Sequence, residues 1–222
     1  QEKALDGVLA KLPKSCAVQG IGIATQRSTV IFWDRKTGKP AARSPSWQDG
    51  RAASIVAPLQ ARQPEVHERT GLYLTPYYSA PKIRWFLDNE PAVRRLAEEG
   101  RLLAAPVSSF LVWRLTRGEV FAADPTVAQR MLLLNLRTLD WDPDMLALFG
   151  VPRAALPSVF SSAGDWGVVE RGGRVGRDAH ERMTRILFGL VVGGRYLDGR
   201  ERRERVAVRK HVRKDGQAAE GR

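Results

Sequence analysis

Arg27 is the side chain of this sequence best placed to bind a ligand, because it lies in a polar corner between two apolar runs. The runs cover residues 18–24 and 29–33, and residues 25–28 separate them. Short apolar runs rich in β-branched residues predict two strands. A guanidinium presents five N–H donors in a planar fork, which suits the adjacent oxygens of a hydroxylated or anionic ligand. The pattern predicts a binding corner, with a surface arginine at a strand end as the alternative.

Two other sequence patterns, a phosphate-binding loop and a histidine metal site, are not matched. Residues 37–39 read Thr-Gly-Lys, but Trp33 stands where a phosphate-binding loop needs its first glycine and Pro40 where it needs a serine or threonine. These residues therefore predict a turn. The three histidines, His67, His180 and His211, have no spacing typical of a metal site. The sequence predicts no metal ligands.

The elements expected to position Arg27 are strands near the start of the sequence, followed along the chain by helices. We expect strands over residues 18–24 and 29–34, and a third extended stretch toward Trp47. Asp49 and Ser79 are expected to cap the helices that follow them. Capping residues, prolines and the helical spacing of apolar residues predict six helices. They cover residues 5–12, residues 52–60, a segment that begins at Ser79, residues 91–100, residues 106–116 and residues 142–149. This order is typical of a mixed α/β architecture.

Composition excludes several classes of protein. The chain has 222 residues, of which 43% are hydrophobic, so it can bury a substantial core. Its longest apolar run, residues 186–192, is far shorter than the roughly 20 residues of a membrane-spanning helix. The lone Cys16 cannot form an internal disulfide, and residues 1–3 lack the basic start of a signal peptide. We expect a cytoplasmic protein without membrane association, and, because the first methionine is Met131, a fragment.

The positive charge is concentrated at the end of the chain. Residues 171–222 hold 15 of the 36 Lys and Arg but 7 of the 24 Asp and Glu, which gives +8 of the formal +12. We expect a basic Gly/Arg-rich tail that is out of frame or disordered. An electrostatic arm for nucleic acid is the alternative. Phe188 and Tyr196 are the only aromatic residues there, too few for a base-stacking platform, so nucleic-acid binding is disfavoured.

A series of short phrases in a fixed order runs through residues 17–169. They stand at residues 22–27, 33–40, 47–49, 70–72, 76–80, 85–89, 113–116, 138–142, 151–153 and 156–157. With them the chain resembles the N-terminal domain of the FGGY carbohydrate kinases, and within that family the glycerol kinases.

The resemblance implies a fold and an activity. The fold is an α/β lobe of the ribonuclease H-like type shared with actin and hexokinase, a mixed sheet with flanking helices, over residues 1–170 and incomplete at its N-terminus. The activity is transfer of the γ-phosphate of MgATP to a sugar or polyol hydroxyl. ATP and Mg²⁺ are implied, but the phosphate loop and adenine lobe of the family have no counterpart in the sequence. Asp165 does not match the family's general base, so no catalytic residue is assigned, and we expect this chain alone to be inactive.

The resemblance also assigns four substrate-binding residues. Arg27 and Tyr77 would contact substrate hydroxyls, and Trp47 would form an aromatic wall against the carbon face. Ser28 stands where glycerol kinases have a glutamate, so a site built around a particular set of hydroxyls is altered there. The substrate is therefore a small polyol or sugar, with glycerol itself in doubt. This interpretation requires that Arg27, Trp47 and Tyr77 share one hollow.

Two other functions stay open from the sequence. A non-catalytic interaction module derived from a kinase lobe would bind polyol or a partner but no ATP. A basic nucleic-acid-binding protein would depend on residues 171–222 and bind in a steeply salt-dependent way. Homo-oligomerisation is left open.

Overall fold

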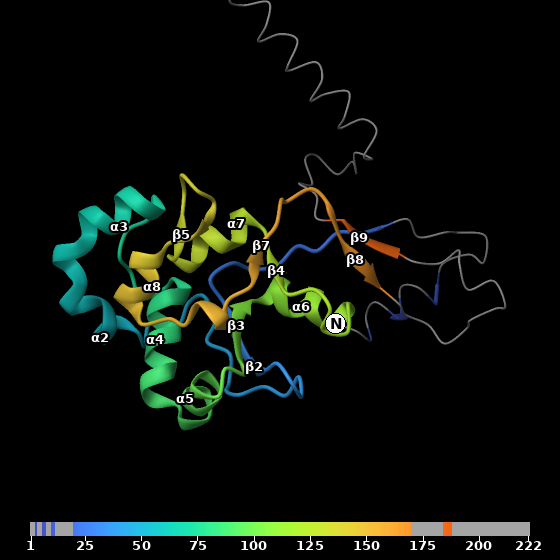
Figure 1. The fold of residues 1–222 in the computed structure, drawn as a ribbon, viewed down its shortest axis with the longest axis horizontal. Coiled ribbons are helices and arrows are strands. Elements are labelled where there is room, and N and C mark those ends of the chain that lie inside the picture. Colours follow the sequence, from blue (N-terminus) through green and yellow to red (C-terminus); the bar gives the residue numbers. More distant parts are fainter. Residues whose placement is uncertain (1–2, 4–5, 8–9, 12–19, 170–183, 188–222) are drawn as a thin grey trace, which may run out of the picture. The chain divides into compact units, whose positions relative to one another are not determined.

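The computed structural model describes most of the chain before residue 170. Described are Lys3 and residues 6–7, 10–11, 20–169 and 184–187. These residues, drawn in colour in Figure 1, all belong to one compact unit, Gln1–Phe188; the second unit, Gly189–Arg222, lies outside the described residues. Of the helix predicted over residues 5–12, only residues 6–7, which are helical, and 10–11, which form a turn, are described. Most of the predicted tail also lies outside the described residues.

The unit is mixed α/β, as predicted. Its strands are β1 (Gly20–Ile21), β2 (Val30–Asp34), β3 (Leu102–Pro106), β4 (Ala122–Ala123), β5 (Leu134–Asn135), β6 (Asp140–Trp141), β7 (Ser158–Val159), β8 (Asp165–Val169) and β9 (Thr184–Leu187). Its helices are α2 (Ala53–Val56), η1 (Ala57–Arg62), α3 (Gln63–Thr70), α4 (Ser79–Asn89), α5 (Pro91–Glu98), α6 (Val107–Leu115), α7 (Pro125–Ala128), η2 (Gln129–Met131), α8 (Pro143–Phe149) and η3 (Arg153–Ala155).

The antiparallel pair of β2 and β3 is the part of the fold that supports the Arg27 corner. Val30 pairs with Pro106 at one end and Asp34 with Leu102 at the other. β2 confirms the strand predicted over residues 29–34, since it is rich in β-branched and aromatic residues. β3 was not predicted. Its residues are all buried, so they form a continuous apolar run without the alternation that marks a half-exposed strand.

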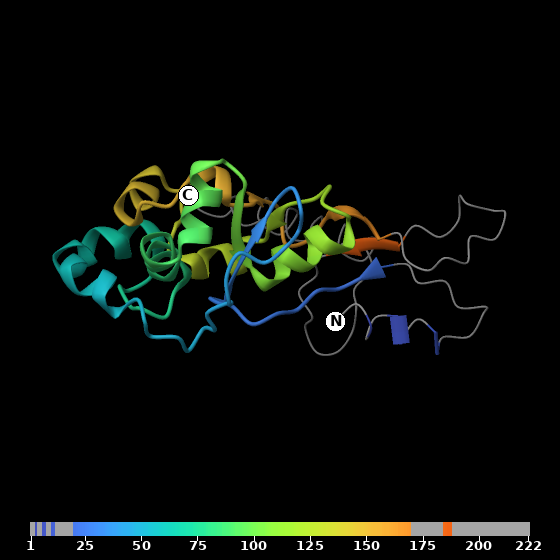
Figure 2. The same cartoon turned by 90° about the horizontal axis from the view of Figure 1, so that it is seen from below.

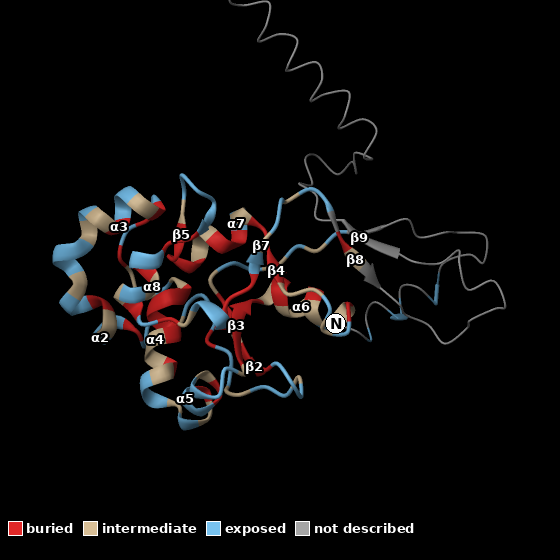
Figure 3. Cartoon of the chain, viewed as in Figure 1, coloured by how far each residue is buried: buried red, intermediate tan, exposed pale blue. Residues whose placement is uncertain are grey.

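Both faces of this strand pair are covered by helices. On one face the fully buried Phe32 stacks on Phe86 of α4, with ring centroids 4.6 Å apart. On the other face the fully buried Trp33 meets Phe110 of α6 edge-on at 5.1 Å. Figures 1 and 2 show β3 between these helices, and Figure 3 shows β3 and much of α4 as buried while α2 and α3 expose their outer surfaces. The packing fixes the start of β2, two residues after Ser28.

The helices predicted after residue 90 are confirmed, and two predicted caps are wrong. α5, α6 and α8 lie where proline and apolar spacing placed them. Asp49 does not cap α2, which begins after Ala52; its carboxylate accepts from the backbone N–H of Arg51 instead. Ser79 is the first residue of α4 rather than its cap, so its hydroxyl turns into the core and has no hydrogen-bond partner among the described residues.

Other predicted extended stretches are shorter or not formed. Only Gly20–Ile21 is a strand within residues 18–24, of which residues 18–19 are not described. Residues 35–52 are all described and contain a single bridge, from Trp33 to Pro40, so the stretch before Trp47 is not a strand. β9 lies within the segment predicted as a tail and pairs with β1 and β8. Within the described part of the chain, no helix has the length and apolar character needed to span a bilayer.

Candidate substrate-binding site

A cavity of about 260 Å³ opens beside the corner that precedes β2. Its walls come from the corner itself, from the turn before α2, from the residues just before α4 and from η2. The lining side chains are Gln26, Arg27, Ser28, Trp47, Tyr77, Tyr78 and Arg130. All four residues singled out from the sequence therefore lie around one hollow, although the segments that carry them are far apart in the chain.

Arg27 lines this cavity and has no competing partner among the described residues. The side chain is exposed, and among the described residues it has no hydrogen bond or ion pair. Its N–H donors are therefore available to a ligand, in the planar arrangement that suits two neighbouring oxygens.

Ser28 gives the corner an unusual backbone. Its φ is +65°, in the left-handed region that residues other than glycine rarely adopt. Its hydroxyl donates to the carbonyl oxygen of Arg130 at 3.4 Å, a long hydrogen bond. The strained conformation turns the chain between Arg27 and β2, so that Arg27 stays at the cavity while Val30 enters the core.

Trp47 and Tyr77 supply the aromatic part of the lining. Their exposed fractions are 49% and 51%, which is high for such large side chains. An exposed aromatic face can pack against the C–H groups of a carbohydrate while a hydroxyl or indole N–H makes hydrogen bonds at its edge. Neither ring is needed to fill the core, since both lie outside the buried clusters.

Arg130 is a lining residue that the sequence reasoning missed. Its Nη1 donates to the hydroxyl of Tyr78 at 3.0 Å, and its guanidinium carbon lies 5.7 Å from the centre of that ring. The cavity thus holds two guanidiniums, from Arg27 and Arg130, and no carboxylate. Gln26 and Tyr78 adjoin predicted residues and could have been included. Arg130 had no such local signal, because its contacts with Ser28 span 102 residues of sequence.

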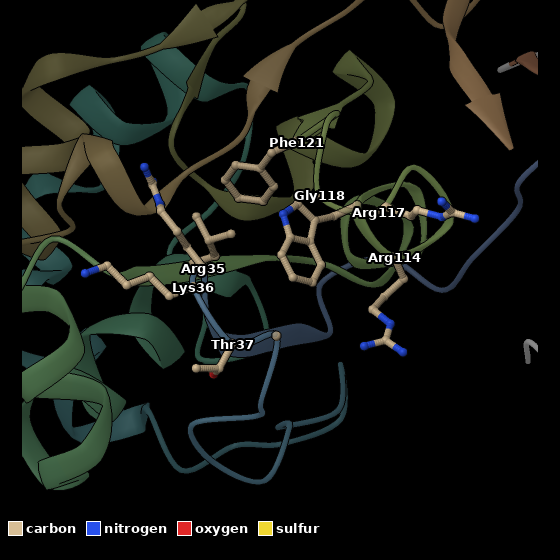
Figure 4. A pocket seen from close by; sticks show the side chains of 10 residues that line it. Arg35, Lys36, Thr37, Arg114, Arg117, Gly118 and Phe121 are labelled. Carbon is tan, nitrogen blue, oxygen red and sulfur yellow. The ribbon is translucent and has the colours of Figure 1, made fainter. Parts of the chain in front are cut away.

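A second, larger cavity of about 610 Å³ lies over the turn at residues 37–38. Figure 4 shows Arg35 and Lys36 on one side of it and Arg114 and Arg117 on the other. The turn predicted from Thr37, Gly38 and Lys39 is therefore part of a basic surface. None of the four predicted site residues lines this cavity.

Comparison with known proteins shows which family this arrangement belongs to. The profile described as "FGGY family of carbohydrate kinases, N-terminal domain" matches residues 2–177. The chain belongs to the FGGY family of carbohydrate kinases. Glycerol kinase of Mycoplasmoides gallisepticum is 43% identical over 157 residues, which cover 71% of this chain and 31% of that protein. Glycerol kinase of Alcanivorax borkumensis is 48% identical over 149 residues, covering 66% of this chain and 30% of that protein.

Solved kinases share the fold. Plasmodium falciparum glycerol kinase with ADP superposes with a TM-score of 0.72 at 29% identity, covering 84% of this chain and 36% of that one. Xylulose kinase of Lactobacillus acidophilus gives 0.68 at 20% identity, covering 85% and 37%. The predicted actin- and hexokinase-like lobe is confirmed. The chain spans about a third of the length of these relatives. The family match and the glycerol kinase relatives favour a kinase domain over an interaction module or a nucleic-acid-binding protein.

The family implies ATP and Mg²⁺, and the cavity does not fit the metal. Mg²⁺ binds carboxylate and phosphate oxygens in a near-octahedral shell. No carboxylate lines the cavity, and within residues 20–169 and the other described positions no group of three or more His, Cys, Asp or Glu side chains gathers. This cavity offers guanidinium donors and aromatic faces, but no carboxylate for the metal.

Proposed function

We propose that Arg27, Ser28, Trp47 and Tyr77 bind the polyol or sugar substrate of an ATP-dependent kinase. The observation that supports this most strongly is that these four side chains line one cavity in a chain of the FGGY carbohydrate kinases. Relatives at 43% and 48% identity are glycerol kinases, which favours a polyol or a small sugar.

Each residue has a distinct role in this proposal. Arg27 donates hydrogen bonds to adjacent hydroxyls, and Tyr77 contributes its own hydroxyl. Trp47 packs against the carbon face of the substrate and excludes water from it. Ser28 is a short neutral acceptor where the glycerol kinases carry a glutamate, so the pattern of hydroxyls it selects differs. Sites that discriminate by buried hydrogen bonds change preference strongly when one partner changes. We therefore propose a polyol or sugar other than glycerol.

The proposed reaction belongs to the whole protein rather than to these residues alone. Transfer of a γ-phosphate requires positioning of the nucleotide and relief of its charge, in addition to binding of the acceptor hydroxyl. We propose that the described residues supply the acceptor side. The inactivity of this chain alone, the domain boundary at residue 170, the cytoplasmic location and any homo-oligomerisation stay predictions.

Titration of the 222-residue chain with glycerol, longer polyols and pentoses tests the proposal. Trp47 is exposed at the cavity, so its emission should change on binding, and Trp47→Phe identifies its signal. Arg27→Met removes charged hydrogen bonds worth about 1.5–3 kcal/mol and should weaken binding roughly 10- to 100-fold. Arg43→Met, at an exposed arginine outside the cavity lining, is the matched control and should bind as the parent does. Binding that Arg27→Met leaves unchanged, or no binding of any of these compounds, would contradict the proposal.

A further inference from the structure

Lys82 is a buried cation that the proposed substrate contacts do not use. It lies in α4, and its side chain has no exposed surface. Its Nζ donates to the carbonyl oxygen of Ser28 at 3.0 Å and to that of Ser46 at 2.7 Å. A buried ammonium loses its hydration, so such hydrogen bonds must replace its contacts with water.

Both carbonyls belong to segments that carry cavity residues. Ser28 lines the cavity and holds the left-handed corner next to Arg27. The Ser46 carbonyl also accepts from the N–H of Asp49 at 3.1 Å, which closes a turn with Trp47 at its first central position. Lys82 thus joins the corner of Arg27 to the turn of Trp47. A strained backbone persists only where its surroundings hold it, and this ammonium is one such restraint.

The third part of the cavity is linked to Lys82 through the chain itself. Tyr77 and Tyr78 immediately precede α4, and Lys82 is on its first turn. Phe86, one turn further along the same face, stacks on Phe32 of β2 and anchors the helix in the core. The ammonium is therefore held at a fixed distance from the strands and from the tyrosines. One side chain connects three segments that meet at the cavity.

Burial of the Lys82 ammonium has a desolvation cost that an apolar side chain would avoid. Burial lowers the pKa of Lys82 to about 8, and the negative charge of Asp49 acts in the opposite direction. Methionine would fill a similar volume without the loss of hydration. The difference between the two side chains is the pair of hydrogen bonds to Ser28 and Ser46.

We propose that Lys82 is a positioning residue, whose ammonium holds the Ser28 corner and the Trp47 turn in the arrangement that binds substrate. The effect on affinity rests on the proposed function. The effect on the corner and the turn does not, and can be measured without a ligand.

Amide hydrogen exchange of the 222-residue chain tests this directly. The probes are the N–H of Val30, which donates to the Pro45 carbonyl, and the N–H of Asp49. Loss of hydrogen bonds from a charged donor should speed exchange at both probes roughly 10- to 100-fold in Lys82→Met, and leave α5 and α8 unchanged. Lys82→Arg keeps the charge and the donors and should restore part of the protection. Lys39→Met, at an exposed lysine away from the cavity, is the matched control and should change neither probe.

The outcomes separate this inference from the proposed function. It is overturned if Lys82→Met leaves both probes unchanged, or speeds exchange equally in α5 and α8, which would indicate a general loss of stability. If Lys82→Met does not fold, Lys82→Gln replaces it: its amide is uncharged and one atom nearer the backbone than Nζ, so the two hydrogen bonds are weakened and faster exchange at both probes is again expected. Polyol titration of the folded variants gives the second measurement, with about tenfold weaker binding expected. Equal affinity in the parent and the variant overturns the inference while the proposed function stands. No polyol binding by the parent overturns the proposed function, and the exchange data still decide the role of Lys82.

Discussion

Two replacements of Ser28 separate the strain of its backbone from the chemistry of its side chain. Ser28→Gly and Ser28→Ala both remove the hydroxyl that donates to the Arg130 carbonyl, so this loss cancels when the two variants are compared. What differs is the cost of a φ of +65°. A residue with a Cβ loses about 1–2 kcal/mol in the left-handed region, whereas glycine adopts it freely.

The expected difference follows from two opposing contributions. Relief of strain favours the glycine variant, and the greater freedom of glycine in the unfolded chain disfavours it by about 0.4–1 kcal/mol. We expect the free energy of unfolding of Ser28→Gly to exceed that of Ser28→Ala by about 0.5–1 kcal/mol. In a chain of this length that is a difference in Tm of roughly 1–4 °C. Urea unfolding followed by tryptophan emission measures it, provided that the m-values agree.

A second left-handed residue provides the control. Leu139 has a φ of +56° and is 50% exposed, outside the lining of the cavity. Its glycine variant should likewise be more stable than its alanine variant, with no change in polyol binding. Ser28→Gly should bind polyol less tightly than Ser28→Ala, because both lack the hydroxyl and only the freer glycine corner must be ordered on binding. The reasoning is refuted if Ser28→Ala is at least as stable as Ser28→Gly while the Leu139 pair behaves as expected.

Three further substitutions have defined outcomes. Asp142→Ala should lower the free energy of unfolding by about 2–4 kcal/mol in urea titrations. The buried carboxylate caps α8 at the N–H groups of Asp144 and Met145, and it also accepts hydrogen bonds from Asn135 and Arg69. Loss of the exposed carboxylate of Asp144, which pairs with Arg69, should cost about 0.5 kcal/mol. The hydrogen bond from Arg101 lowers the pKa of Asp34 from its usual 3.8 to about 2. The stabilisation from this pair is therefore complete above about pH 5 and is lost as the pH falls toward 2. Unfolding measured between pH 5 and 2 should therefore show the deficit of Arg101→Met shrinking with acid. Gly150→Ala should cost about 1 kcal/mol in the same urea assay, because φ is +59° at the end of α8.

The sequence could predict those side chains of the site that stand in a recognisable local sequence pattern. It could not predict those that reach the cavity only through contacts between distant parts of the chain. Arg27 was marked by the polar corner between apolar runs, and Trp47 and Tyr77 by the phrases around them. Arg130 reaches the same cavity through a contact with Ser28 across 102 residues, which no window of sequence contains. Lys82 did have a signal. It stands four residues before Phe86, on the apolar side of the predicted helix, so a lysine at such a position was visible in the sequence, and the structure shows it to be buried.

The fold likewise has elements that the sequence could predict and elements that it could not. α4 was predictable because its apolar residues follow the helical period, and β2 because its run is rich in β-branched and aromatic residues. β3 was not, since its run of leucine, alanine and proline has neither a period nor a composition typical of strands. The cap predictions failed by position: a serine caps a helix only when it precedes the first helical residue, and Ser79 is itself that residue. Serine does favour the start of a helix, but Ser79 stands one residue after the cap position, which Tyr78 occupies.

Three departures from local preference meet at one place in this chain, and that concentration is the argument for function there. Ser28 adopts a backbone conformation that serine disfavours, Lys82 buries a charge that methionine could replace, and Arg27 has no partner among the described residues. Other left-handed positions are taken by glycines, as at Gly71 and Gly150 after helices, and by Arg117, Leu132 and Leu139, so it is the combination of the three departures that distinguishes this place. Strain and burial of charge lower stability wherever they occur, and chains retain them mainly where a site requires the geometry. The two hydrogen bonds of Lys82 are the physical link between them, because one ammonium holds the strained corner that presents the free guanidinium to the cavity.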